Sequence, residues 1–453
     1  MGRIALVATV GSTDNGISLD YPYSKVATLP FLKHGNAKDV SIHKFLDALK
    51  RRRLRPSEIA MDLLIISATM YAADTRINRE QFAEDNWTRQ IDLYIPVSNP
   101  DLWNTQKVRL EQIFRFLTGD IWKLCFRDRS DKDFKVSPVS KLTRFQMPYE
   151  TNTVCLFSGG MDSFIGAIKL LESGVRPLLV GHSKSADVGP YQKNCANALK
   201  LAYPSIAPER IYAYISIPKN ELFNSEDHTE RGRSFMFLSL GAICGSAVNS
   251  EGSNLYVPEN GMISLNIPLT PLRVGSHSTR TTHPHYLSMM QDLFDDLQLG
   301  VKIENPFQFF TKGEMIKDCA NQSILLNTET MSCSHPSGRY EGKGNAHCGR
   351  CVPCIIRQSS YSAAGVSDRS LYRTDIKNGP MEIDKANGAD ILAFKYMIAK
   401  VKKHPTYLNA AIRITGPLGN DVDRYLGVYS RALQEVESFL DNIELTKTAK
   451  VKA

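Results

Sequence analysis

A serine–glycine–glycine turn between two apolar runs could bind phosphate. Residues 153–157 (TVCLF) have the β-branched and aromatic content of a short buried strand, and residues 164–171 repeat apolar side chains at helical spacing. Glycine lets the backbone turn tightly and approach a ligand closely, and the amides at a helix start attract anions. The six residues of this turn are Ser158, Gly159, Gly160, Met161, Asp162 and Ser163.

The same turn could instead do no more than cap the helix, with a serine or aspartate side chain bonded to the first amides. It is not a Walker A loop, because no Gly-Lys-Ser/Thr sequence follows the glycines. In either case we expect Asp162 to face solvent, since it stands in the turn between strand and helix.

Cysteines form the second candidate site. Of the nine cysteines in the chain, four have the spacing C-x14-C-x2-C-x2-C, and they are Cys333, Cys348, Cys351 and Cys354. Thiolates this close together can wrap one tetrahedral Zn²⁺, and a closed four-sulfur site is structural because it leaves no open position. His335 or His347 could replace one cysteine as a ligand. The alternative is four unrelated thiols.

Composition sets broad limits on the class of protein. The chain has 453 residues, with 42% hydrophobic and 23% charged residues, as in soluble globular proteins. The net charge is +8, but only residues 50–55 (KRRRLR) form a dense basic run, which suits a helix end or an acidic partner. Direct nucleic-acid binding is not indicated. No apolar run approaches the ~18 residues that span a membrane, and the odd cysteine count favours a reduced compartment. We therefore expect a cytoplasmic protein.

The N-terminal part, residues 1–145, is expected to be an added α+β unit. Residues 91–97 alternate like a strand, and residues 110–117 have helical periodicity. The unit contains all three tryptophans, Trp87, Trp103 and Trp122. These could pack in a core, or they could belong to a surface that docks a partner, where Trp and Arg are enriched.

The rest of the chain divides into three parts. Residues 150–330 alternate strands and helices, which predicts an α/β domain with a doubly wound parallel sheet and ligands at the carboxyl ends of its strands. Residues 331–375 hold the cysteine motif. Residues 376–453 are predicted to be helical, with a disordered basic tail that contains Lys447, Lys450 and Lys452.

The turn at 158–163 resembles the PP-loop of the N-type ATP pyrophosphatases, whose pattern is Ser-Gly-Gly-x-Asp-Ser. All five specified positions match. The resemblance implies a doubly wound α/β domain that activates a substrate oxygen by adenylation. It assigns the loop to the phosphates of ATP, with Asp162 as a Mg²⁺ contact.

Loop and cysteines together resemble the 7-cyano-7-deazaguanine synthase (QueC) family, over roughly residues 150–375. Less strict likenesses are RGRSFMFLS at 231–239, Pro258-Glu259-Asn260, and FTKGEM at 310–315. Arg233 and Lys312 from these segments could bind phosphate or a carboxylate. Each could equally form a surface ion pair. The resemblance implies ATP, Mg²⁺ and Zn²⁺ as cofactors.

Several features depart from the usual synthases. The first cysteine gap is long, the loop at 180–184 lacks the usual Asp-Tyr-Gly-Gln, and the block STRTTHP at 278–284 and the N-terminal unit are additions. These features look like the QueC-like branch found in bacterial anti-phage defence, which includes the Qat system and a class of CBASS operons.

The resemblance implies an ATP-dependent ligase. It would adenylate the carboxylate of a 7-carboxy-7-deazaguanine-type base and form an amide with an amine on a protein partner from the same defence operon. With ammonia as the amine, a second activation would convert the amide into the nitrile, 7-cyano-7-deazaguanine (preQ0). Two other classes stay open: a nucleotide-sensing subunit without turnover, and another PP-loop enzyme such as a tRNA thiolase. A thiolase would need a catalytic cysteine pair, whereas the remaining cysteines of this region are scattered, at Cys155, Cys195, Cys244 and Cys319.

Overall fold

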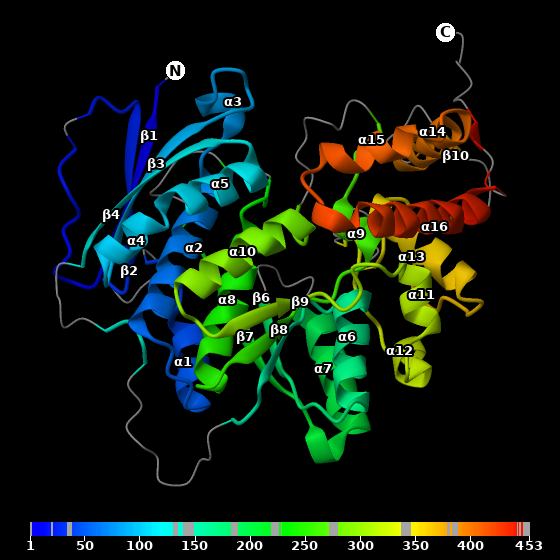
Figure 1. Ribbon diagram of the computed structural model, residues 1–453, viewed down its shortest axis with the longest axis horizontal. Helices are drawn as coiled ribbons and strands as arrows, with labels where there is room; N and C mark the ends of the chain where they lie inside the picture. The colour runs from blue at the N-terminus through cyan, green and yellow to red at the C-terminus, as the bar shows by residue number, and fades with distance from the viewer. Residues whose placement is uncertain are drawn as a thin grey trace.

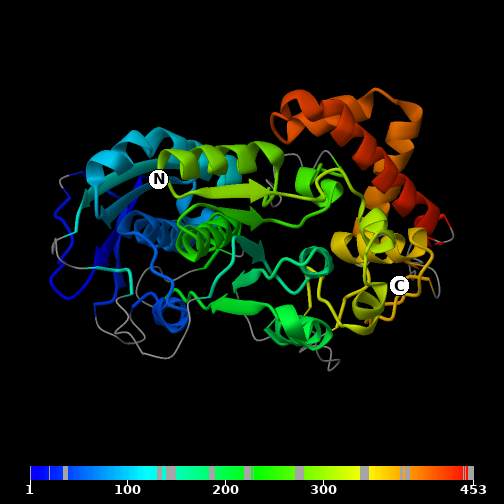
Figure 2. The ribbon, with the colours of Figure 1, turned by 60° about the horizontal axis from the view of Figure 1, so that its bottom comes forward.

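Two parallel β-sheets and a group of C-terminal helices make up the computed structural model (Figure 1). Figure 2 shows that the first sheet and the C-terminal helices lie at opposite ends of the molecule. The structure describes residues 2–19, 21–33, 39–129, 135–138, 149–182, 189–218, 226–227, 229–270, 280–336, 346–377, 381–382, 388–441, 443 and 445–446. The basic tail lies outside these residues.

The first sheet has the strand order β2-β1-β3-β4. Its strands are β1 (Ile4–Val10), β2 (Lys25–Phe31), β3 (Gln90–Val97) and β4 (Ile121–Asp128). All of its pairings are parallel, with Ile4 opposite Ile91 and Gln90 opposite Ile121. The strand predicted at 91–97 is confirmed. The unit was expected to be α+β, and its sheet is fully parallel. Helices α1–α3 lie in the chain between β2 and β3, and α4 and α5 lie between β3 and β4.

The helices of this part are α1 (His43–Arg51), α2 (Glu58–Arg76), α3 (Arg79–Phe82), α4 (Pro100–Thr105) and α5 (Lys107–Thr118). Residues 60–76 of α2 are all buried, because the helix is apolar on every side and lies between the first sheet and α8. One hydrophobic core therefore contains side chains of both sheets, for example Leu93 and Leu156.

The second sheet has the order β7-β6-β5-β8-β9, and all of its pairings are parallel. Its strands are β5 (Thr153–Leu156), β6 (Leu178–His182), β7 (Glu209–Ala213), β8 (Ser253–Tyr256) and β9 (Val301–Glu304). The crossover segments contain α6 (Met161–Glu172), α7 (Gly189–Ala202), η1 (Pro204–Ile206), α8 (Arg233–Val248) and α10 (Pro284–Asp296). This is the predicted doubly wound α/β sheet. Its strand order reverses between β5 and β8, where such sheets bind ligands.

Helices dominate after the second sheet, as predicted. They are α11 (Lys312–Lys317), α12 (Gln322–Asn327), α13 (Val352–Ala363), α14 (Ala389–Lys403), α15 (Tyr407–Ile414), η4 (Gly419–Asp421) and α16 (Val422–Leu440), with a short α9 (Gly261–Leu265) before them. β10 (Met381–Glu382) and β11 (Leu445–Thr446) pair in parallel. A second core forms among α9 and α13–α16. In the described part of the chain, no helix combines the length and apolar character needed to cross a membrane.

The arginine run ends α1 and contacts the second sheet, and two tryptophans pack in the core. Helix α1 ends at Arg51, and the next residue, Arg52, binds Glu209 (2.9 Å) and the carbonyl of Arg210 (2.7 Å). Trp103 and Trp122 are buried in the core. Of the alternatives for these residues, helix termination and core packing fit their positions.

Candidate functional site

The predicted turn lies between β5 and α6, at the point where the strand order of the second sheet reverses. Gly159 has a φ of +79°, a region that favours glycine. A Cβ atom there would lie 2.8 Å from the Cγ of Gln192 and 2.9 Å from its backbone nitrogen. Glycine is therefore required at this position by both its backbone angle and its contact with α7.

The start of α6 has no side-chain cap, which argues against a turn that serves only for capping. Gly160 is the N-cap residue, and its amide donates to the Ser158 hydroxyl at 3.2 Å. The hydroxyls of Ser158 and Ser163 lie 3.2 Å apart. Hydroxyls and helix-start amides gathered at one point are the donors that bind phosphate oxygens.

Asp162 does not face solvent, so that expectation is wrong. Its side chain is buried, with Lys312 Nζ 2.8 Å from Oδ1. Oδ2 accepts from Asn260 Nδ2 (2.6 Å) and from the Asn260 amide (3.2 Å). Burial raises the pKa of Asp162, but the charge of Lys312 and the hydrogen bonds outweigh it and hold that pKa below its usual value.

Glu259 lies beside this pair. Burial and the negative charge of Asp162 hold the pKa of Glu259 well above its usual value. Of the two carboxyl groups, Glu259 is therefore the one that binds a proton more readily. The sequence drew attention to this strand end only through its likeness to the family.

The N-terminal cap of α11 fixes the backbone from which the Lys312 side chain reaches Asp162. Thr311 and Glu314 form a capping box, in which Thr311 Oγ1 accepts from the Glu314 amide (3.0 Å) and Glu314 Oε2 accepts from the Thr311 amide (2.8 Å). This reciprocal pair fixes the backbone of the residue between them. The helix dipole at a helix start disfavours a lysine, so the carboxylate of Asp162 is what holds it there.

Helix α16 holds the same turn from outside. Glu435 accepts a hydrogen bond from the Thr311 hydroxyl and another from the Gly313 amide (3.3 Å). Arg431 Nε lies 2.6 Å from Glu314 Oε1. Burial raises the pKa of Glu435 to about 7. The C-terminal helices thus contact both residues that flank Lys312, which no local sequence pattern indicated.

Arg233 is the first residue of α8 and lines the same cavity as Ser158 and Ser163. Its side chain is 40% exposed, with Nη1 3.4 Å from Glu230 Oε2. Nη2 donates to the carbonyl of His182 at 3.5 Å. These long contacts leave the guanidinium accessible to a ligand.

The first sheet anchors the segment before Arg233. The amide of Gly232 donates to Asp74 Oδ2 of α2 (2.8 Å), and Arg231 Nη1 donates to the carbonyl of Thr118 (3.0 Å). Burial raises the pKa of Asp74, although the charge of Arg89 opposes this effect. Behind it lies a buried ion-pair network that the sequence did not reveal, made of Asp74, Arg79, Arg89 and Asp120.

A cavity of about 280 Å³ opens at the carboxyl ends of β5, β6 and β8. Ser158, Ser163 and Arg233 line it, and so does Glu259. Lys312 is not among the described residues that line it, because its ammonium reaches Asp162 instead. The structure therefore brings together the loop hydroxyls and one of the two predicted cations. Phe237 and Thr282 also line the cavity; both lie in segments noted in the sequence, at 231–239 and 278–284, but neither was assigned a role there.

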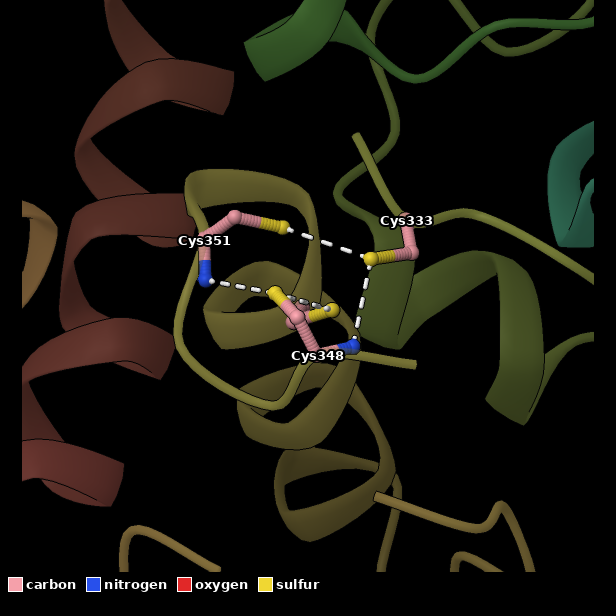
Figure 3. A group of neighbouring side chains, drawn as sticks. Cys333, Cys348 and Cys351 are labelled. Carbon is pink, nitrogen blue, oxygen red and sulfur yellow. Dashed lines mark hydrogen bonds between the residues drawn. The ribbon is translucent and has the colours of Figure 1, made fainter. Parts of the chain in front are cut away.

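The four cysteines of the predicted motif meet at the start of α13 (Figure 3). Their sulfur atoms all lie within 4.8 Å of one another, and the Cys333–Cys351 and Cys348–Cys354 sulfur pairs are 3.9 Å apart. Tetrahedral Zn²⁺ with Zn–S bonds of about 2.3 Å would separate its sulfurs by about 3.8 Å, so these residues fit zinc. The group contains neither His335 nor His347. The Nε2 atom of His347 instead accepts from the Ser332 amide at 3.4 Å.

Amides surround the cluster as well. Cys333 Sγ accepts from the amides of His335 and Cys348, both at 3.2 Å, and Cys348 Sγ accepts from the Cys351 amide at 3.4 Å. Such bonds stabilise thiolate charge and orient metal ligands. The doubly wound sheet, the Ser-Gly-Gly turn at its switch point and this four-sulfur group define an α/β protein of the PP-loop class with a cluster suited to zinc.

Comparison with known proteins finds similarity to one family over part of the chain. Residues 282–365 match the model of QueC, described as queuosine biosynthesis protein QueC. The chain is 24% identical over 254 residues to the 7-cyano-7-deazaguanine synthase of Picrophilus torridus, covering 50% of this chain and 97% of that protein. For the enzyme of the same name from Prochlorococcus marinus, identity is 23% over 239 residues, covering 48% and 96%. The enzyme from Methanocaldococcus jannaschii is 35% identical over 72 residues, which cover 16% of this chain and 31% of that protein. The chain is thus similar to QueC over residues 282–365 and, across about half of its length, to nearly the whole of two synthases.

Proposed function

We propose that the protein is an ATP-dependent enzyme that forms a C–N bond at the carboxylate of a 7-carboxy-7-deazaguanine-type base. The observation that carries the proposal is the uncapped start of α6, which meets the hydroxyls of Ser158 and Ser163 at the edge of the 280 Å³ cavity. Relatives that match half of this chain are named 7-cyano-7-deazaguanine synthase, which supports the choice of substrate class.

The first step is adenylation. One carboxylate oxygen of the acid attacks the α-phosphorus of ATP, the bond from that phosphorus to the bridging oxygen breaks, and pyrophosphate leaves. The α6 amides and the two loop hydroxyls would bind the phosphates, and Arg233 would bind the carboxylate of the acid or a phosphate. Lys312 would act through Asp162, which it holds ionised next to the loop.

Asp162 and Glu259 are the residues that would hold Mg²⁺. The raised pKa of Glu259 and the lowered pKa of Asp162 indicate two neighbouring carboxyl groups whose mutual repulsion a bound cation would relieve. When bound, Mg²⁺ would supply charge neutralisation at the phosphates. The fit is chemical: the two adjacent carboxyl groups offer oxygen ligands, while Asn260 donates to both through Nδ2 and uses its Oδ1 to cap α9.

The second step transfers the acyl group. The nitrogen of an amine attacks the acyl carbon, the bond from that carbon to the AMP oxygen breaks, and the amine nitrogen loses a proton to solvent. AMP and an amide are the products. The site needs only to place the amine beside the acyl-adenylate, because the activated carbon reacts readily once the two are aligned.

We propose that the amine belongs to a partner protein and that the reaction serves anti-phage defence. The support is the share of the chain that the synthases do not match: one relative is covered over 97% of its length by 50% of this chain. The unit at residues 1–145 is the part we propose for docking this partner. The alternative acceptor is ammonia, which the name of the relatives favours. A second ATP-dependent activation would then remove the amide oxygen and give the nitrile of 7-cyano-7-deazaguanine.

One assay tests the core of the proposal. The full chain is incubated with ATP and Mg²⁺, with and without 7-carboxy-7-deazaguanine, and pyrophosphate and AMP are measured. We expect release that depends on the acid, loss of release in Ser163→Ala, and normal release in Ser173→Ala, a serine at the other end of the same helix. ATP binding without acid-dependent release would point to a nucleotide-sensing subunit and refute adenylation. Mass spectrometry of the amide, with ammonium or a co-encoded protein as acceptor, separates the two acceptors.

A further inference from the structure

A second cavity, of about 270 Å³, lies between α7, α12 and α13. Glu329 and Thr330 form part of its wall. The next two residues contact the Ser-Gly-Gly turn: the amide of Met331 donates to the carbonyl of Gly159 (3.0 Å), and Ser332 Oγ accepts from the amide of Met161 (3.4 Å). The cavity is thus separated from the proposed nucleotide site by one short stretch of backbone.

A buried guanidinium borders this cavity. Arg357 of α13 is 2% exposed. Its Nε and Nη2 donate to Ser370 Oγ at 3.0 and 2.8 Å, and its Nη1 donates to Thr330 Oγ1 at 2.8 Å. Among the described residues, no carboxylate lies within ion-pair distance of it. Burial of a cation is costly, and here the nearby charge of Asp368 offsets part of that cost without contacting the guanidinium.

The two hydroxyl groups that accept from Arg357 have their own protons available to donate at the cavity surface. A guanidinium can only donate hydrogen bonds, so Ser370 and Thr330 must accept with their oxygens and have their own protons left to donate. Both side chains line the cavity. Within the described part of the chain, neither hydroxyl has an acceptor for that proton. The nearby acid, Asp368, is already engaged by the Ser370 amide (2.9 Å) and the Tyr372 hydroxyl.

Side chains of opposite charge lie at the mouth of the cavity. Arg369 is exposed there and donates from Nη1 to Asn327 Oδ1 at 2.6 Å. Glu329 is also exposed at the cavity and would repel a polyanion such as a triphosphate. Two guanidinium groups, two hydroxyl donors and one opposing carboxylate suit a ligand with a single anionic group.

We propose that this cavity is a second binding site of the protein, which takes a small molecule carrying one carboxylate or one phosphate group. The Ser370 and Thr330 hydroxyls bind the anion, Arg357 polarises them from behind, and Arg369 binds the anion from the mouth. Neither the chemistry of the site nor its test requires that the protein adenylate anything.

Equilibrium dialysis of the full zinc-loaded chain tests the proposal. The nucleotide site is first saturated with a non-hydrolysable ATP analogue, and the probes are inorganic phosphate in one arm and 7-carboxy-7-deazaguanine in the other. We expect about one equivalent of one probe to bind, with affinity reduced at least about tenfold in Arg369→Gln, the loss of a charged hydrogen bond. Ser370→Ala should also weaken binding. Arg424→Gln, an exposed arginine on α16, should not.

The two arms distinguish the source of the anion, since phosphate binding identifies a phosphate ligand and acid binding alone identifies a carboxylate. Binding of neither probe, or equal binding by wild type and Arg369→Gln, would overturn the proposal. If the chain does not bind the ATP analogue, the proposed function fails, whereas the titration with phosphate and acid still decides the fate of the second site. Arg357 itself is not substituted, because the loss of this buried side chain would destabilise the packing around α13.

Discussion

Lys312 and Asp162 form a 2.8 Å ion pair that joins the start of α11 to the start of α6. Both side chains are buried, with side-chain exposures of 6% and 8%. The pair places a charged contact directly behind the proposed phosphate loop, and it links that loop to the C-terminal helices through the capped turn of α11. The first two predictions follow from this link.

Lys312→Gln should destabilise the protein by about 3–5 kcal/mol, because it leaves a buried carboxylate without its partner. The pH dependence should also change sign. In the wild type the lowered pKa of Asp162 contributes stability that is present above about pH 3.9 and lost as the pH falls. In the variant burial dominates, so the free energy of unfolding should fall as the pH rises above about 4.

Urea unfolding at several pH values measures both effects. Lys302→Gln is the matched control, since that lysine is exposed and its contact with Glu304 is 4.0 Å long; we expect a change below about 0.5 kcal/mol. Equal stabilities for the two glutamine variants would show that the buried pair contributes nothing.

Glu435→Gln should make the protein less sensitive to pH. The pKa of Glu435 is raised to about 7 by burial, against about 4.3 in an unfolded chain. The folded state therefore holds the proton more tightly, and the stability contributed by this proton is lost as the pH rises through about 7. Thermal unfolding between pH 5 and 8 should show a smaller decline in Tm for the variant. Glu437→Gln, on the same helix, should keep the wild-type decline; an identical profile for all three proteins contradicts the assignment.

Gly159→Ala and Gly174→Ala form a matched pair. Both glycines have positive φ, +79° and +76°, so alanine costs ~1–2 kcal/mol at each for the left-handed backbone. A Cβ atom at Gly174 meets nothing within 4 Å, whereas at Gly159 it overlaps Gln192. Gly159→Ala should therefore cost ~1–3 kcal/mol more, and it should abolish acid-dependent pyrophosphate release while Gly174→Ala retains it. Denaturant unfolding and the release assay check the two parts, and equal losses would mean that the loop tolerates a side chain.

Cys351→Ser should lose zinc and unfold at a lower temperature. Zinc held by four thiolates contributes roughly 10 kcal/mol or more to the folding of its segment, and removing one ligand weakens it strongly. Cys125→Ser is the control, because Cys125 lies in β4 outside the cluster. Elemental analysis should give about one zinc per chain for the wild type and the control. Absence of zinc from wild-type protein prepared without chelator would refute the site.

The local parts of the site could be predicted from the sequence. The strand, the Ser-Gly-Gly turn and the helix of residues 153–172 are adjacent in the chain, so apolar spacing and glycine chemistry were sufficient to place them. The same holds for Cys348, Cys351 and Cys354, whose short spacing brings the sulfurs together at one helix start. The alternation of strands and helices also predicted the doubly wound sheet, because parallel strands need crossover helices.

Only the tertiary structure decided what surrounds these parts. Asp162 was expected in solvent, yet Lys312 and Asn260 enclose it. Gly232 is fixed by Asp74 of a helix that lies between the two sheets, and the turn of Lys312 is held by Glu435 near the end of the chain. These contacts join residues that are about 100 to 160 positions apart. Hydrophobic periodicity does not indicate which distant charged residues will contact one another. Burial of apolar faces brings the elements together, and the resulting packing then determines which polar side chains become partners.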